Sequence, residues 1–297
     1  MNTSSDIAGL MGLPVNEKTA FTNHKDQEKD KLKKQQGKIV KNFVPLIEQF
    51  LEPGEKIVLA AQGASPFSAL EQMTTGWSLI YVVKRCILVV TNHRILHLPA
   101  TWNNKPKNII SQVRYGDLES VKVKGKSLRL VYKSGKKERF TQIRNAKKLR
   151  TLMEKLDIRK FTPTAFAARH HLCPRCAHPL NAENYLCQKC RLEFRNPSRA
   201  RKLSIIFPGG GYFYTRRPLL GVLDAMVEGY LLILVLLFLF VRDGSQAAQA
   251  GTGVLFVAGF LGIVLLLEKI VTIYHAQHYI REFIPVEKEF NRIRAGA

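Results

Sequence analysis

Acidic residues are scarce in this chain: 23 Asp and Glu stand against 46 Lys and Arg among 297 residues, which gives a net charge of +23. Such a surplus repels itself unless it lies against an anion, so phosphates of lipid headgroups or nucleic acid are the expected partners. Residues 1–18 lack a basic run leading into an apolar core, and we expect no secretory signal. A hydrophobic content of 46% excludes disorder throughout and allows more than one folded core.

The motifs of common catalytic sites are also missing. The sequence contains no Walker phosphate loop, no His-Glu-x-x-His metal site, no nucleophile elbow and no Ser-His-Asp order. The glycines at 209–211 follow no predicted strand and open an apolar segment, which does not fit a phosphate loop. Cys86 lies in an apolar run, where a packed thiol is expected. We therefore expect no enzymatic activity.

Cysteines number only five, and four of them form two Cys-x-x-Cys pairs separated by ten residues. Each pair directs two thiolates at one ion, so the two pairs predict a tetrahedral site for one structural Zn²⁺ with no open position for substrate. The two matched pairs disfavour a redox dithiol, and a metal site favours a reducing compartment. The expected ligands are Cys173, Cys176, Cys187 and Cys190, whereas the nearby His170, His171 and His178 are expected not to bind the ion.

The first 160 residues divide into a tail and a β domain. Residues 1–38 are polar and Lys-rich and predict a flexible tail, with a membrane-surface helix as the alternative. Residues 39–160 predict an antiparallel β domain that ends in a helix near 145–157. Gly125 and Gly135 are placed where hairpin turns need positive φ. The expected strands are EKIVLAAQ, WSLIYVV, CILVVT, RILHLP, NIISQVRY, LESVKVK, SLRLVYK and KKERFTQI.

Basic residues concentrate in the second half of this domain. Residues 101–160 contain 18 Lys and Arg but 5 Asp and Glu, over half of the net charge in a fifth of the chain. The strands and turns there predict an anion-binding surface, and solvated edge lysines that oppose aggregation are the alternative. The predicted surface comprises Lys122, Lys124, Lys126, Arg129, Lys133, Lys136, Lys137 and Arg139.

Two long apolar runs predict a transmembrane hairpin within residues 201–280, with spans at about 219–241 and 253–273. The link at 242–252 carries one Arg and one Asp, whereas dozens of Lys and Arg precede the first span. The positive-inside rule then places both the N- and C-termini in the cytoplasm and the hairpin in the inner membrane. Residues 281–297 predict an amphipathic tail that lies along the membrane or packs back on the cysteine segment.

Charged residues inside the predicted spans have an expected partner. Asp224 and Glu228 are one helical turn apart, at about the depth of Lys269 in an antiparallel hairpin. Because an unpaired charge in a membrane costs at least about 2.5 kcal/mol, we predict an ion pair of Lys269 with Asp224 or Glu228. We interpret it as helix registration, and a proton or ion path is the alternative.

Three regions of the chain each resemble a known family, and the β domain is the first of them. LEPGEKIVL at 51–59, LVVTNHRILHL at 88–98, and YGDLESVKVK followed by SLRLVYKSGKK resemble the bacterial pleckstrin-homology-like domains, which are close to GRAM domains. This resemblance implies a strongly bent, seven-stranded antiparallel barrel closed by one helix, which binds lipid or protein.

Residues 161–200 resemble a short zinc ribbon, in which Gly usually follows the second cysteine of each pair. Ala177 and Arg191 stand there, so less regular turns are expected. FPGGGYFYTRRPLLG resembles the opening of the TM2-type membrane domains, with Pro208, Gly209, Gly211 and Tyr214 at matching positions.

Three functions remain open at this point. The first is a non-enzymatic, membrane-anchored adaptor whose basic domain binds anionic lipid or a protein partner, with the zinc ribbon as a rigid connector. The second is a membrane-tethered nucleic-acid-binding protein, in which Arg175, Lys189, Arg191 and Arg195 extend the basic surface. The third is an accessory subunit of a transport complex or an enzyme of unrecognised type. Because two helices alone do not enclose a pathway, transport requires a homo-oligomer or a larger partner.

Overall fold

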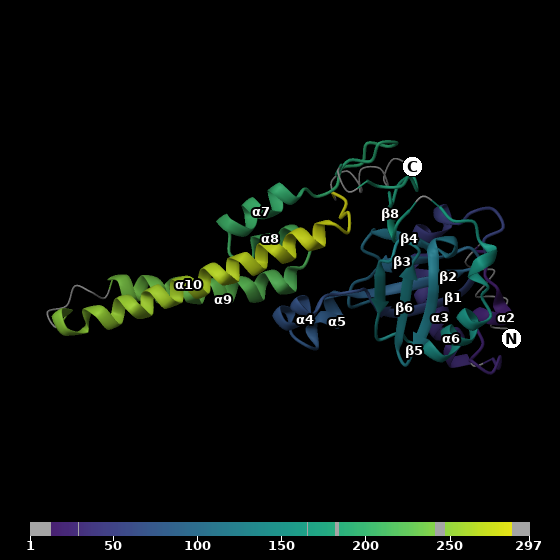
Figure 1. The fold of residues 1–297 in the computed structure, drawn as a ribbon, viewed down its shortest axis with the longest axis horizontal. Coiled ribbons are helices and arrows are strands. Elements are labelled where there is room, and N and C mark those ends of the chain that lie inside the picture. Colours follow the sequence, from purple (N-terminus) through teal and green to yellow (C-terminus); the bar gives the residue numbers. More distant parts are fainter. Residues whose placement is uncertain (1–12, 29, 165, 182–183, 241–246, 287–297) are drawn as a thin grey trace. The chain divides into compact units, whose positions relative to one another are not determined.

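The computed structural model describes residues 13–28, 30–164, 166–181, 184–240 and 247–286. These residues fall into two compact units, which divide between Glu193 and Phe194. The first unit contains the β-strands, and the second contains the two longest helices (Figure 1).

Two antiparallel sheets form the framework of the first unit, one of five strands in the order β1-β2-β3-β4-β8 and one of three in the order β5-β6-β7. The prediction of one closed, seven-stranded barrel is therefore wrong, because the strands form two separate sheets. The 3-10 turn η2 (Tyr115–Asp117) ends β4, and β8 instead of β5 pairs with the free edge of β4. The strands are β1 Ile57–Ala64, β2 Arg85–Thr91, β3 Arg94–Pro99, β4 Ile110–Arg114, β5 Leu118–Lys124, β6 Ser127–Tyr132, β7 Lys137–Phe140 and β8 His170–Leu172.

One core lies between the two sheets and is covered by helix α6 (Ala146–Glu154). Leu88 of the first sheet, Leu130 of the second and Leu149 of the helix are buried together there. The predicted C-terminal helix is thus confirmed, because its apolar residues share the face that covers the core. The predicted turns are confirmed as well, since Gly125 has φ 58° and Gly135 has φ 80°.

A second core covers the other face of the five-stranded sheet. Helices α2 (Glu17–Ala20) and α3 (Asp30–Ile47) and the 3-10 turn η1 (Glu48–Phe50) precede β1. Phe43 and Ile47 of α3 pack in one cluster with Ile87 of the sheet. Helix α3 begins at Asp30, inside the Lys-rich segment that was predicted as a flexible tail. Its buried apolar residues begin at Ile39, and the composition of residues 30–38 did not reveal that the helix extends back from there. The buried Gln36 side chain binds Ala60 at both ends, donating to its oxygen at 2.7 Å and accepting from its nitrogen at 3.2 Å.

The run WSLIYVV was predicted as a strand, and this prediction is wrong. Its residues belong to a helical insertion between β1 and β2, made of α4 (Ala69–Thr75) and α5 (Leu79–Val83). A capping box starts α4, in which Ser68 and Glu71 exchange hydrogen bonds of 3.1 and 2.9 Å. Lys84 at the end of α5 forms a buried ion pair of 2.8 Å with Glu71. These contacts across the insertion outweigh the β propensity of the run.

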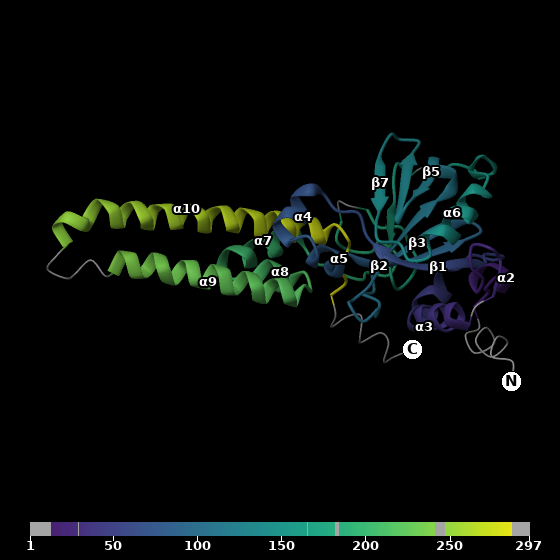
Figure 2. The same ribbon diagram turned by 90° about the horizontal axis from the view of Figure 1, so that it is seen from below.

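The second unit is helical. It contains α7 (Pro197–Ile206), α8 (Gly210–Tyr214), α9 (Pro218–Phe240) and α10 (Ala247–Ile280). Helices α9 and α10 lie side by side in both views (Figure 2). Residues 218–238 and 255–280 are long and apolar enough to cross a membrane. Most of their large side chains are exposed, whereas a core helix of a soluble protein is mostly buried.

The glycines before α9 permit a close approach of four helices. Gly209 has φ 67°, and a Cβ atom there would collide with the Gly221 carbonyl oxygen of α9. A Cβ atom at Gly211 would collide with the Ser204 hydroxyl of α7 and press on Ala276 of α10. Side chains at these positions would separate α8 from its neighbours.

The described part of the predicted C-terminal tail packs against the start of the second unit. Phe283 and Ile284 are buried. The Phe194 and Phe283 rings meet edge to face at 5.7 Å, and the Arg195 amide donates to the Ile284 oxygen at 2.9 Å. Residues 287–297 of the predicted tail lie outside the described residues.

Candidate functional site

The four predicted cysteines form one cluster. Strand β8 leads directly into Cys173, and all four Sγ atoms lie within 4.8 Å of one another. The Sγ atoms of Cys173 and Cys190 are 3.5 Å apart, as are those of Cys176 and Cys187. Four sulfurs at about 2.3 Å from a shared ion would be about 3.8 Å apart in a tetrahedron, so the cluster fits a metal ion. Both of these pairs join one Cys-x-x-Cys turn to the other, so the four sulfurs converge on one point instead of forming a separate dithiol in each turn.

The two cysteine turns have matching backbones. Ala177 and Arg191, where Gly is usual, adopt φ 57° and 59°. In each turn the residue after the second cysteine donates to the first cysteine's oxygen, at 3.0 Å from Ala177 and 2.9 Å from Arg191. The expected irregularity is therefore wrong, because the hydrogen bonds hold both non-glycine residues in the left-handed conformation.

Ala177→Gly should tighten metal binding by about 1 kcal/mol, or about fivefold, because glycine adopts positive φ without the strain that alanine stores. The measurement is competition for Zn²⁺ between the full chain and a chelating indicator. Ala146→Gly, at the start of α6, is the control and should leave the affinity unchanged. An affinity of Ala177→Gly at or below that of the parent chain would contradict the strain argument.

Of the three histidines near the cluster, His170 is occupied elsewhere. Its Nε2 atom lies within hydrogen-bonding distance of Nε2 of Gln112 on β4. Burial and the positive charge of Arg114 lower the pKa of His170 to about 4, so the ring is neutral near pH 7. Among the residues that the structure describes, the metal-capable side chains grouped at this cluster are the four cysteines, and no histidine belongs to the group.

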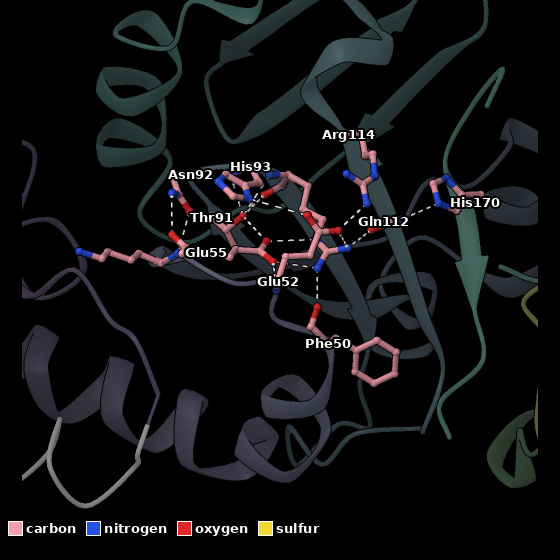
Figure 3. A network of polar contacts seen from close by, with 12 residues as sticks. Phe50, Glu52, Glu55, Thr91, Asn92, His93, Gln112, Arg114 and His170 are labelled. Carbon is pink, nitrogen blue, oxygen red and sulfur yellow. Dashed lines mark hydrogen bonds and ion pairs between the residues drawn. The ribbon is translucent and has the colours of Figure 1, made fainter. Parts of the chain in front are cut away.

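His170 belongs to a buried polar network (Figure 3). Gln112 links it to Arg94, which lies at the centre of the network. The Arg94 guanidinium donates to both carboxylate oxygens of Glu55, at 3.0 and 2.7 Å, and Thr91 donates to Glu55 at 2.6 Å. Burial opposes ionisation of Glu55, but its hydrogen bonds outweigh burial and hold the pKa of Glu55 below its usual value. This network joins the segments LEPGEK and TNHR. Local spacing did not predict it, because Arg94 and Glu55 are 39 residues apart in the sequence.

The predicted basic surface separates into a row and two turns. The strand register places Lys122 opposite Arg129 and Arg129 opposite Arg139, so three exposed cations cross β5, β6 and β7 in a line. We call these three residues the cationic row. A groove of about 340 Å³ follows it and is also lined by Lys137. Like charges directly opposite each other destabilise a sheet. Lys124 and Lys126 lie at the β5–β6 turn, and Lys133 and Lys136 at the β6–β7 turn.

A second concentration of positive charge lies in a cleft. Of its basic residues, Lys126 alone was part of the predicted surface. The cleft of about 930 Å³ lies where the end of β1, the β5–β6 turn and the start of α6 meet. Burial, followed by repulsion from Arg144, lowers the pKa of Arg85 in its wall. Lys148 is already paired with Asp26 at 2.7 Å. The basic residues that line this cleft are Arg85, Lys126, Arg144, Lys147, Lys148 and Arg150.

The polar residues predicted inside the spans lie together. Nζ of Lys269 on α10 is 2.6 Å from Oε2 of Glu228 on α9 and also donates to the Ser204 oxygen of α7 at 2.9 Å. Asp224 is instead hydrogen-bonded to Thr272, at 3.1 and 3.2 Å. Thr272 also binds Glu268, at 2.9 Å. Of the two predicted partners of Lys269, the structure thus brings Glu228 to it.

Comparison with known proteins assigns this chain to no group. No protein-family model, no curated protein and no solved structure matches it. The features of the chain that bear on its function are the cysteine cluster, the cationic row and the two apolar helices.

Proposed function

We propose that this protein is a non-enzymatic adaptor, anchored in the inner membrane, whose first unit binds anionic phospholipid headgroups at the cytoplasmic face. The cationic row carries the proposal. Each of its residues faces another cation across the ladder, an arrangement that costs stability in the free protein and becomes favourable when an anion lies against it. The adjoining groove offers room for a phosphate group.

The membrane anchor in this proposal is the pair α9 and α10. Their apolar side chains are exposed along most of both helices, and hydrocarbon is the solvent in which such a surface is stable. The large excess of Lys and Arg before α9 supports a cytoplasmic first unit by the positive-inside rule.

We also propose that the cysteine cluster binds one structural Zn²⁺. A four-thiolate site suits this ion, and a closed site of this kind stabilises a segment too small to fold by itself. The order of strands followed by α6 supports a pleckstrin-homology-like class for the first unit, and the glycine-dependent packing before α9 supports a TM2-like class for the second.

The test is capture of the full chain, reconstituted in neutral nanodiscs, by phosphatidylserine liposomes across a salt series. Binding should survive about 0.15 M salt, where the Debye length is near 8 Å. Substituting serine for Lys122, Arg129 and Arg139 together should weaken capture by about 3 kcal/mol, or roughly a hundredfold, at about 1 kcal/mol for each cation. The same triple variant should gain thermal stability, because the repulsion between the strands is removed.

The matched control substitutes serine for Arg144, Lys147 and Arg150 at the cleft, which removes the same charge. Equal losses in both triple variants would show that only net charge matters and would contradict the proposal. Single-stranded RNA added as a competitor separates the alternatives. RNA that binds with a steep salt dependence, while liposomes do not bind, would favour the nucleic-acid function.

A further inference from the structure

The helical insertion between β1 and β2 exposes large apolar side chains. Leu70 and Met73 of α4 are 48% and 75% exposed, and Trp77 before α5 is 77% exposed. Figure 1 and Figure 2 both show α4 and α5 outside the two sheets. A folded surface that leaves such side chains in water has an unfavourable hydration free energy, which contact with an apolar partner would remove.

A second exposed tryptophan lies on the loop that adjoins the insertion. Trp102, between β3 and β4, is 70% exposed. Arg85, which follows the insertion, donates to the Trp102 oxygen at 2.5 Å. Lys107 of the same loop donates to the Val83 oxygen at the end of α5, at 3.4 Å. The loop 100–107 is therefore fastened to the base of the insertion.

The charge pattern of this surface is that of a membrane-contacting segment. Residues 65–84 contain two charged residues in the sequence, Glu71 and Lys84, and these are buried against each other. The exposed face of the insertion is therefore uncharged. The cations at its border include Arg85 and Lys107, which bind the adjoining loop and the base of the insertion, and the loop also carries the exposed Lys105. An apolar tip bordered by cations matches a bilayer, in which hydrocarbon lies beneath a layer of phosphates.

The insertion is also held rigid without help from Leu70, Met73 or Trp77. Besides the capping box and the buried Lys84–Glu71 pair, the Phe67 and Tyr81 rings meet edge to face at 5.6 Å across it. The exposed side chains are thus presented by a folded scaffold, so little ordering entropy is lost when they find a partner.

We propose that α4 and α5 form a membrane-docking hairpin that places Met73, Trp77 and Trp102 at the headgroup level of a lipid bilayer. Tryptophan is enriched at that level because its ring is apolar and its indole N–H is polar. The partner is the bilayer itself, and the apolar helices α9 and α10 of the same chain keep a bilayer within reach. This inference does not depend on the cationic row.

The chain provides its own reporter, because Trp77 and Trp102 are its two tryptophans and neither apolar helix contains one. The full chain is reconstituted in phosphatidylcholine nanodiscs, with or without bromine on the acyl chains, and tryptophan emission is measured. Trp102→Phe and Trp77→Phe isolate each reporter. In both variants we expect bromine to lower emission at least about twofold, since headgroup-level rings contact the upper acyl chain.

A third reporter controls for general proximity to the bilayer. Phe166→Trp in a chain that lacks Trp77 and Trp102 places the indole at an exposed site of the same unit outside the insertion, and its emission should not respond to bromine. Equal emission of Trp77 and Trp102 in brominated and plain lipid would overturn the proposal and indicate a protein partner instead. Equal quenching at position 166 would overturn it as well. Because the lipid is neutral, failure here leaves the liposome test of the cationic row unaffected.

Discussion

Cys187→Ser is expected to abolish metal binding and to unfold the segment between β8 and the second unit. The thiolate is the metal-binding form of cysteine, and a serine hydroxyl does not replace it at neutral pH. Structural zinc sites of four ligands contribute about 10–16 kcal/mol to folding, far more than so short a segment obtains from its own core. The readouts are zinc per chain, measured by elemental analysis, and protease cleavage between residues 173 and 195.

Cys86→Ala is the matched control for the cysteine change. Cys86 is buried in β2 among the core residues between the sheets and lies outside the four-cysteine cluster. Its loss should lower the free energy of unfolding by about 1 kcal/mol while one zinc ion stays bound. A Cys187→Ser chain that kept its zinc and its resistance to protease would disprove the metal site.

Lys269→Met should lower the free energy of unfolding of the second unit in detergent by about 3–5 kcal/mol. The change leaves the Glu228 carboxylate buried without its cation, and a buried charge that loses its partner costs this much. The measurement is unfolding of the full chain in mixed micelles, followed by helical circular dichroism.

Two further variants separate the ion pair from other effects of Lys269. Lys269→Met combined with Glu228→Gln should recover part of the loss, because no charge remains unpaired. Lys202→Met, on an exposed position of α7, removes the same charge and should change stability little. If Lys269→Met were as stable as the parent chain, the ion pair would have no role in holding α9 against α10.

Short-range patterns predicted the parts of the molecule that are determined locally. The four cysteines follow from their spacing, since a Cys-x-x-Cys turn alone brings two sulfurs to one side. Helix α6 follows from an apolar period that matches one helical face, and the two long helices follow from the length of their apolar runs. All four residues of the candidate metal site could therefore be predicted from the sequence, and so could the glycine turns that separate β5, β6 and β7.

The long-range contacts were decided only by the tertiary structure. The sequence suggested a strand at 77–83, but a buried ion pair between Lys84 and Glu71 keeps that run helical. It also suggested one closed barrel, whereas β8 from the cysteine segment takes the edge of β4. The eight predicted cations became three in one row, four at the turns and Lys137 at the start of β7, because strand register sets which side chains face each other. Spacing along a chain specifies neighbours within a few residues, while pairing between distant segments depends on the free energy of the whole packed fold.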